Sequence, residues 1–333
     1  MDRQKILPKW RGFNLPDMFS TKREGYFSEE DFKMMSDWGF NFVRLPLSYR
    51  IWSSIDNPYE ISEEKIAPLD EAVYFGKKYG IHTNIAFHRI PGYCVCSTED
   101  VGEKYNFWRD DEARRAAAFQ WREIAKRYKN ESNDSVSFNI INEPELEVCY
   151  KDYHDAHQAC VDAIYEISPD RLIMLDGIHG YYPPLEAMRN FDKCGFSIHC
   201  YEPGIVTHQG VGEGHMDKVP WPHNRKYGAY GERTVRNIGE LDGIIALWAA
   251  ASEIFNVGVH CGEFGCFYKL PHKYACAYVE DYLAVMQKYN IGWAMWNLRG
   301  CFGIMDNGRE DCEMIDFCGH KLDVKMLKIL QKY

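Results

Sequence analysis

The chain has 333 residues, of which 46% are hydrophobic and 15% aromatic, enough to bury the core of one large domain. Its formal net charge is −10, from 39 basic and 49 acidic residues. That balance argues against nucleic acid and against an anionic membrane surface as partners. No run of about 18 apolar residues occurs, so we expect no membrane span.

The segment Met1–Trp10 lacks the apolar stretch of a signal peptide. This predicts a cytoplasmic protein, or a secreted one if a leader was removed. Cysteine is abundant, with 12 residues, and in a chain of this length we expect free buried thiols rather than a disulfide framework. Cys94 and Cys96 are too close for a zinc pair. We therefore expect no metal, no cofactor and no obligate protein partner.

Short apolar segments alternate with longer amphipathic ones, which is the pattern of successive βαβ units. Strands are expected at Trp10–Leu15, Asn41–Leu45, Ile81–His88, Ser135–Glu143, Leu172–Leu175, Phe196–Tyr201, Asn256–Glu263 and Gly292–Trp296. Helices are expected at Ser28–Trp38, Ser62–Tyr79, Asp110–Tyr128, Tyr150–Ile167, after Pro184, and at Ile238–Phe255, Lys273–Tyr289 and Leu322–Lys332. This alternation predicts a single (β/α)8 TIM barrel over residues 1–333. The segment Glu202–Thr234 is expected to be one long functional loop.

Two of the predicted strands end in a glutamate. The first runs through an apolar segment to Glu143, and Pro144 stops it because proline has no N–H to donate to a sheet. The second, which begins at Asn256, ends at Glu263. Two parallel strands would thus each deliver one carboxyl group to the same end of the barrel.

Polar side chains end most of the other predicted strands as well. The C-terminal ends of barrel strands form one rim, and that rim carries the active site of such barrels. The candidates on the rim are Arg44, His88, Asn142, Glu143, His199, Tyr201, Glu263 and Trp296. One such residue is often purely structural, but eight at the same end favour a functional cluster.

Two carboxyl groups on one rim suit glycoside hydrolysis. Retention of the anomeric configuration requires them to lie about 5 Å apart, and inversion requires a wider gap. Retention also requires one ionised carboxylate and one protonated carboxyl group in different environments. We expect Arg44 to keep Glu263 charged, and Glu143 to occupy a drier or more anionic setting that retains its proton.

The remaining rim residues have possible roles around a sugar. Asn142 suits a hydrogen bond to the 2-hydroxyl group, His199 and Tyr201 suit orienting the carboxylates, and Trp296 suits a floor under the ring. The alternative is a metal centre. Its ligands would be His88, His199, His260, Glu143 and Glu263. No HxH or HExxH spacing supports it.

The chain contains an ordered set of motifs: Arg11-Gly12-Phe13-Asn14-Leu15, Phe42-Val43-Arg44-Leu45-Pro46, His88-Arg89-Ile90-Pro91-Gly92-Tyr93, Asn142-Glu143-Pro144, His199-Cys200-Tyr201, Gly262-Glu263-Phe264-Gly265 and Trp293-Ala294-Met295-Trp296-Asn297. This set resembles that of glycoside hydrolase family 5, the cellulase-type retaining β-glycosidases, and the chain is similar to compact bacterial endoglucanases of that family. The motifs cover roughly residues 10–300. Each motif is weak alone, but the ordered set is specific.

The resemblance implies a (β/α)8 barrel with Glu143 as the acid/base and Glu263 as the nucleophile. It implies that the substrate is bound by Arg44, His88, Arg89, Asn142, His199, Tyr201 and Trp296. Two positions depart from the family pattern: Arg89, where some relatives carry a second histidine, and His179, where relatives often carry asparagine. Both positions would face substrate, so the sugar specificity stays open.

Three functions are compatible with these residues. The first is an endo-acting hydrolase of β-1,4-glucan with mannan as a possible second substrate, and it predicts an open cleft lined by Trp52, Trp108 and Trp221. The second is an intracellular exo-acting β-mannosidase or β-glucosidase, in which a loop (89–108 or 202–234) blocks one end of the cleft. The third, a non-catalytic carbohydrate-binding barrel, would need neither glutamate.

Overall fold

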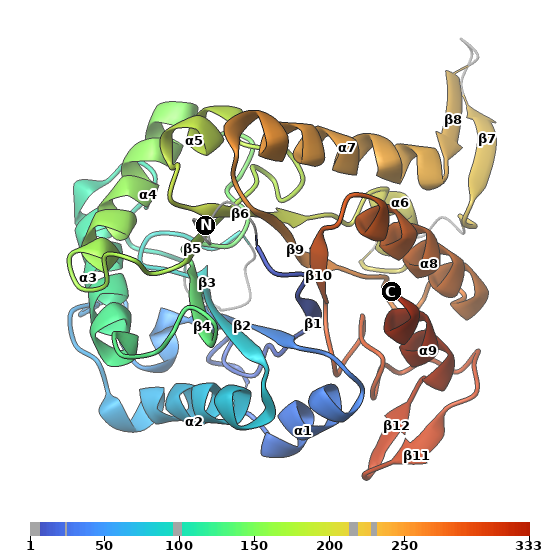
Figure 1. Cartoon of the computed structure of the whole chain (residues 1–333), viewed down its shortest axis with the longest axis horizontal. Helices are drawn as coiled ribbons and strands as arrows, with labels where there is room; N and C mark the ends of the chain where they lie inside the picture. Colours follow the sequence, from blue (N-terminus) through green and yellow to red (C-terminus); the bar gives the residue numbers. More distant parts are fainter. Residues whose placement is uncertain (1–6, 24, 96–101, 213–218, 228–231) are drawn as a thin grey trace.

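Eight parallel strands close into a barrel with helices around its outside (Figure 1), which confirms the predicted (β/α)8 fold. The computed structural model describes residues 7–23, 25–95, 102–212, 219–227 and 232–333. Around the barrel the strands follow the order β1-β2-β3-β4-β5-β6-β9-β10, and β10 pairs with β1 to close the ring. Strands that are neighbours in this order are therefore neighbours in space, and their C-terminal ends share one rim.

The barrel strands are short and almost completely buried, as expected for parallel strands covered by helices. They are β1 (Arg11–Asn14), β2 (Phe42–Ser48), β3 (His82–Arg89), β4 (Val136–Asn139), β5 (Ile173–Asp176), β6 (Gly195–His199), β9 (Val259–Phe264) and β10 (Gly292–Met295). Polar residues on the inner side of these strands, such as Arg44 and Asn139, are buried as completely as their apolar neighbours. Such residues need partners inside the barrel.

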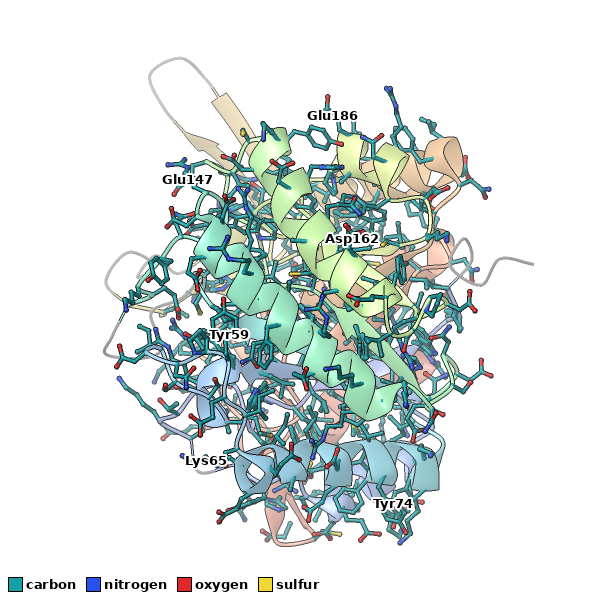
Figure 2. The ribbon with its side chains drawn as sticks, turned by 90° about the vertical axis from the view of Figure 1, so that its left-hand side faces the viewer. Tyr59, Lys65, Tyr74, Glu147, Asp162 and Glu186 are labelled. Carbon is teal, nitrogen blue, oxygen red and sulfur yellow. The ribbon has the colours of Figure 1, made fainter. Side chains whose placement is uncertain are left out.

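The barrel helices are α1 (Glu29–Asp37), α2 (Glu63–Tyr79), α3 (Asp111–Tyr128), α4 (Tyr150–Tyr165), α5 (Leu185–Asn190), α7 (Ile238–Phe255), α8 (His272–Lys288) and α9 (Val324–Lys332). Figure 2 shows α3 and α4 side by side on one flank, with Asp162 on the outer part of α4. A 3-10 turn, η1 (Tyr49–Ile51), follows β2, and the short α6 (Gly204–Thr207) follows β6. Among the described residues, none of these helices is both long and apolar enough to cross a bilayer.

Local signals in the sequence account for several helix ends. Ser62 caps α2 by accepting a hydrogen bond from the backbone N–H of Lys65, and Gly80 ends the helix in the left-handed conformation with φ of 67°. Asp323 caps α9 by accepting from the N–H of Met326. The barrel scaffold therefore follows from patterns that are visible in the sequence.

Strand β4 ends earlier than predicted, at Asn139 rather than at Glu143. The chain still follows the barrel rim beyond this point, because the N–H of Ile140 donates to Met174 O at 3.2 Å and the N–H of Asn142 donates to Phe87 O at 2.9 Å. The chain then turns at Glu143, whose φ is 43°. The glutamate thus lies on a turn above the strand rather than within it.

The segment Glu202–Thr234 contains more regular structure than the single loop predicted. It includes α6 and an antiparallel hairpin of β7 (His223–Tyr227) and β8 (Glu232–Arg236), which projects from the barrel next to the start of α7 (Figure 1). A second hairpin, β11 (Ile315–Phe317) with β12 (His320–Leu322), was not predicted. Its turn residues Cys318 and Gly319 both have positive φ, of 50° and 80°, which suits a two-residue hairpin turn.

The described cysteines are all free thiols, and most of them are buried. Burial raises the pKa of several, including Cys160, Cys261 and Cys266, so these thiols stay protonated and pack as small apolar side chains. This agrees with the expectation of free buried thiols. Cys96 lies outside the described residues.

Candidate active site

Glu263 is the last but one residue of β9, and donors reach both of its carboxylate oxygens. Arg44 Nη1 lies 2.5 Å from Oε1, and the Tyr201 hydroxyl donates to Oε2 at 2.9 Å. The residue is 4% exposed, so its charge is stabilised by these side chains rather than by water. The predicted contact between Arg44 and Glu263 is present.

The Arg44 side chain is held from several directions inside the barrel. Its Nε donates to Asn139 Oδ1 at 3.0 Å, and its Nη1 donates to Asn14 Oδ1 at 3.1 Å. Its Nη2 donates to Asn142 Oδ1 at 2.8 Å. The guanidinium is a rigid planar fork, so these contacts fix both its position and that of Glu263.

Glu143 lies opposite Glu263 on the rim, and its backbone is held on both sides. Its N–H donates to Asp176 Oδ2 at 3.0 Å, and the Tyr93 hydroxyl donates to its carbonyl oxygen at 2.6 Å. These bonds stabilise a left-handed conformation that is unusual for glutamate. Its side chain is 22% exposed, whereas that of Glu263 is 5% exposed. Only Glu143 therefore opens appreciably to solvent.

Residue 180 must be a glycine because its backbone passes close to the turn that carries Glu143. The residue has φ of 76°, and a Cβ there would lie 2.8 Å from His199 O and 3.2 Å from Glu143 Oε1. Any larger residue would push Glu143 or the end of β6 away. Gly180 thus sets how closely the β5 and β6 ends approach the carboxyl group.

His199 connects the two glutamates and Asp176. Its Nδ1 lies 3.1 Å from Glu143 Oε1 and 3.5 Å from Glu263 Oε1, and its Nε2 lies 3.4 Å from Asp176 Oδ2. Burial lowers the pKa of His199, but the carboxylates of Asp176 and Glu263 outweigh burial and raise it above the ordinary value. These two carboxylates stabilise the charged form of the imidazole against the effect of burial.

The pKa values of the two glutamates are pushed in opposite directions. Burial raises the pKa of Glu263 and the nearby charge of Glu143 adds to this rise, while His199, Arg44 and Tyr201 oppose it. Burial also raises the pKa of Glu143, but the hydrogen bond and charge of His199 outweigh it, so that its pKa is lowered. The environments differ, but in the opposite sense to that expected: the pKa of Glu263 is raised despite Arg44, and Glu143 is the more exposed group with the lowered pKa.

The separation of the two carboxyl groups is the geometric quantity that the sequence could not give. One carboxylate oxygen of Glu143, one of Glu263 and one ring nitrogen of His199 all lie within 4.8 Å of one another. Carboxyl groups about 5–5.5 Å apart are typical of retaining glycosidases, and inverting enzymes have about 6.5–9.5 Å. The spacing therefore supports retention.

The expected ligands of the metal alternative are not all at this site. His260 packs against Trp10 and Phe42, with its ring centroid 4.5 Å from that of Phe42. The Arg44 guanidinium already supplies a positive charge beside Glu263, where a cation would otherwise be attracted. The site is built for two carboxyl groups and their donors.

His88 and Trp296 form an aromatic surface at the rim. Their rings stack with centroids 5.8 Å apart, and Phe19 packs against His88 at 4.3 Å. Trp296 is half-buried, so part of its ring is accessible. Burial, followed by the charge of Arg44, lowers the pKa of His88 well below its ordinary value, which keeps it neutral.

Arg89 has a different partner from the one expected. Its side chain is 4% exposed, and its Nη1 lies 2.9 Å from Glu103 Oε1, which also binds Arg50 Nη2 at 2.7 Å. Glu103 Oε2 accepts from the backbone N–H of Gly92. The structure therefore places Arg89 in a network that anchors the segment after β3. His179, the second residue that departs from the family's sequence pattern, is exposed at the rim with φ of 52°.

The expectation that three tryptophans line an open cleft is wrong. Trp52 is 1% exposed, Trp108 is 4% exposed and Trp221 is 2% exposed. The indole N–H of Trp52 donates to Gln120, and that of Trp221 donates to Asp281. These side chains fill the spaces between rim segments and helices, where they bury large apolar area.

Sequence reasoning missed three residues that support the site. Asp176 binds the backbone of Glu143 and faces His199, while Asn14 and Asn139 hold Arg44. Asp176 carried a usable signal, since it is a charged residue at the end of an otherwise apolar strand. The sequence signal for the two asparagines was weak.

Comparison with protein families matches residues 2–301 to the family described as Cellulase (glycosyl hydrolase family 5). The chain belongs to this family. It is a glycoside hydrolase, and the resemblance noted from its motifs is confirmed.

Curated relatives agree with this assignment. Cellodextrinase A of Ruminococcus flavefaciens is 27% identical over 253 residues, which cover 75% of this chain and 71% of the relative. Endoglucanase C of Acetivibrio thermocellus is 27% identical over 308 residues, covering 82% of this chain and 84% of the relative. A crystal structure described only as a glycoside hydrolase superimposes with a TM-score of 0.89 at 28% identity, over 98% of this chain and 99% of the other. The similarity extends over nearly the whole barrel.

Proposed function

We propose that this member of the family hydrolyses β-1,4-linked glucan with retention of configuration, through a double displacement by Glu143 and Glu263. The observation that carries the proposal is the pair of carboxylate oxygens within 4.8 Å of each other. The substrate class is supported by the two curated relatives, which are named a cellodextrinase and an endoglucanase. Mannan is a second polymer that this site would accept.

In the first step Glu263 is the nucleophile. Its carboxylate attacks the anomeric carbon and forms a glycosyl ester, while the bond to the leaving sugar oxygen breaks. Arg44 and Tyr201, at 2.5 and 2.9 Å, orient the carboxylate and stabilise it as the leaving group of the second step. The negative charge is therefore stabilised before and after the ester exists.

Glu143 is the acid/base. It gives a proton to the departing oxygen in the first step and takes one from water in the second, when that water displaces Glu263 from the sugar. His199 Nδ1 lies 3.1 Å from Glu143 Oε1, within hydrogen-bond reach, so the two groups can exchange a proton. The partial exposure of Glu143 allows water to reach it.

Asn142 would hold the substrate through its amide nitrogen. Arg44 donates to Asn142 Oδ1, which leaves Nδ2 as a buried donor with no hydrogen-bond partner among the described residues. A buried donor of this kind costs free energy until a ligand satisfies it, and a sugar hydroxyl would do so. Trp296, stacked on His88, would support the apolar face of the ring.

A second candidate is exo-acting cleavage of short oligosaccharides, by a β-glucosidase or β-mannosidase in the cytoplasm. The observation that favours it is the burial of the three tryptophans that an extended cleft would have exposed. The relative named a cellodextrinase is consistent with short glucan substrates.

A time course of products from cellohexaose and mannohexaose, resolved by size, distinguishes these candidates. Early products of two to four sugars from cellohexaose would support endo-acting glucan hydrolysis. Release of monosaccharide alone would support the exo-acting candidate. Turnover of mannohexaose without turnover of cellohexaose would contradict the glucan assignment.

A further inference from the structure

A second cluster of chemically reactive side chains lies away from the glutamate pair, where α8 and α9 begin. A ligand atom of His272, Cys312 Sγ and an oxygen of Asp323 all lie within 4.8 Å of one another. Cys276 Sγ is 3.4 Å from His272 Nε2, and Asp323 Oδ2 is 2.7 Å from the same nitrogen. Hydrolysis as derived above uses none of these groups.

The spacing of these residues suits metal coordination. His272 and Cys276 are four positions apart on α8, so both side chains leave the same helix face. Cys312 comes from the segment between β10 and β11, and Asp323 immediately precedes α9. Thiolate, imidazole and carboxylate together form a donor set that favours Zn²⁺ over the hard ions Ca²⁺ and Mg²⁺.

Neighbouring bonds hold the cluster in place. Asp323 Oδ1 accepts from the N–H of Met326 at 3.0 Å, which leaves Oδ2 directed to the imidazole. The backbone N–H of His272 donates to Asp311 Oδ2 at 2.7 Å, which positions the first turn of α8. Supporting contacts of this kind orient metal ligands in structural zinc sites.

Burial and charge also fit a metal ion. His272, Cys276 and Asp323 are buried, whereas Cys312 is only partly buried and offers a path of entry. The nearby guanidinium of Arg309 is occupied with the carbonyl oxygens of Tyr268 and Leu270. The cluster thus differs from the glutamate pair, where an arginine directly contacts a carboxylate.

We propose that His272, Cys312 and Asp323 bind one zinc ion, and that Cys276, whose Sγ lies 3.4 Å from His272 Nε2, shifts toward the ion as the fourth ligand. The ion would join the beginnings of α8 and α9 to the segment that leads into the β11–β12 hairpin. It would be structural, because four protein ligands leave no open position for a substrate.

The test is to measure zinc content and thermal stability of the full chain. Protein purified without chelator should contain about one zinc per chain. Removal by a strong chelator should lower Tm, and added Zn²⁺ should restore it. Substitution by Co²⁺ should give thiolate-to-cobalt charge-transfer absorption, which reports the sulfur ligands directly.

Cys312→Ser removes one proposed ligand at a partly buried position, so the variant should fold and bind zinc at least about tenfold more weakly. Cys276→Ser should do the same. The matched control is Cys318→Ser, an exposed thiol in the β11–β12 turn, which should bind as the parent does. Zinc binding unchanged by Cys312→Ser, or a Tm that responds to neither chelator nor zinc, would overturn the proposal and leave a hydrogen-bonded His–Asp pair.

Discussion

Replacement of Glu143 by glutamine separates its role as an acid from its role in the structure. Glutamine has the same shape but carries no proton that it can give to a leaving group. The backbone contacts from Asp176 and Tyr93 do not involve the side chain, so the turn should be preserved. The amide oxygen of the variant can still accept a hydrogen bond from His199 Nδ1, which lies 3.1 Å from the Glu143 carboxylate in the parent.

The expected loss depends on the leaving group. General acid catalysis contributes about 10²–10⁴-fold, which corresponds to about 3–5 kcal/mol of activation free energy. This full loss is expected in kcat/KM for cello-oligosaccharides, whose leaving hydroxyl needs a proton. Aryl glycosides with an acidic phenol need little protonation, so their kcat/KM should fall much less.

The assay compares kcat/KM of the Glu143→Gln variant on cellotetraose and on a dinitrophenyl β-cellobioside. Glu147→Gln, the same change at an exposed position four residues further along the chain (labelled in Figure 2), is the control and should retain parental rates on both substrates. Equal losses on the two substrates would refute the acid role. Retained activity on cellotetraose would refute the placement of the residue in the reaction.

Four further outcomes are expected. Glu263→Ala should abolish turnover with the circular dichroism spectrum preserved, and a retained rate would remove the nucleophile assignment. NMR of freshly formed product should show the β-anomer first; the α-anomer would contradict the retaining mechanism inferred from carboxyl oxygens within 4.8 Å of each other. Tyr201→Phe removes a hydrogen bond to a charged group, worth about 1.5–3 kcal/mol, so kcat/KM should fall about 10–100-fold. Because Tyr201 lowers the pKa of Glu263, the acid limb of the pH profile should also move to higher pH, and an unmoved limb would count against this contact. Burial raises the pKa of Asp31 from 3.8 to about 6, despite its ion pair with Arg299. The folded state therefore binds the Asp31 proton more tightly than the unfolded state does. The stabilisation that comes from this bound proton is lost as pH rises from about 4 to 6. Relative to Asp31→Asn, the parent should lose about 3 kcal/mol of unfolding free energy across that window, measured by urea denaturation, and a pH-independent difference would contradict the raised pKa.

The barrel could be predicted because its signals are local. Buried strands such as Gly195–His199 and caps such as Ser62 and Gly80 are short-range features that the backbone follows directly. The two hairpins outside the barrel were missed for the opposite reason. Their strands are polar and short, so hydrophobic patterning does not mark them.

Aromatic residues show where sequence reasoning was misled. Trp52 and Trp221 occur in segments near the rim, as does Trp296, and composition cannot distinguish a core side chain from a sugar platform. Their indole N–H partners, Gln120 and Asp281, come from distant helices. Only packing between those elements decided which ring is accessible.

The sequence by itself identified the two candidate catalytic carboxyl groups. Glu143 lies just beyond the end of β4 and Glu263 lies near the end of β9, and parallel strands in a closed barrel must bring those ends to one rim. The tertiary structure decided how they react. Closure of the barrel brings carboxyl oxygens of Glu143 and Glu263 within 4.8 Å of each other, with His199 beside both glutamates and Arg44 against Glu263. These quantities depend on contacts between residues far apart in the chain, and a pKa depends on the position of every nearby charge, so no local pattern encodes them.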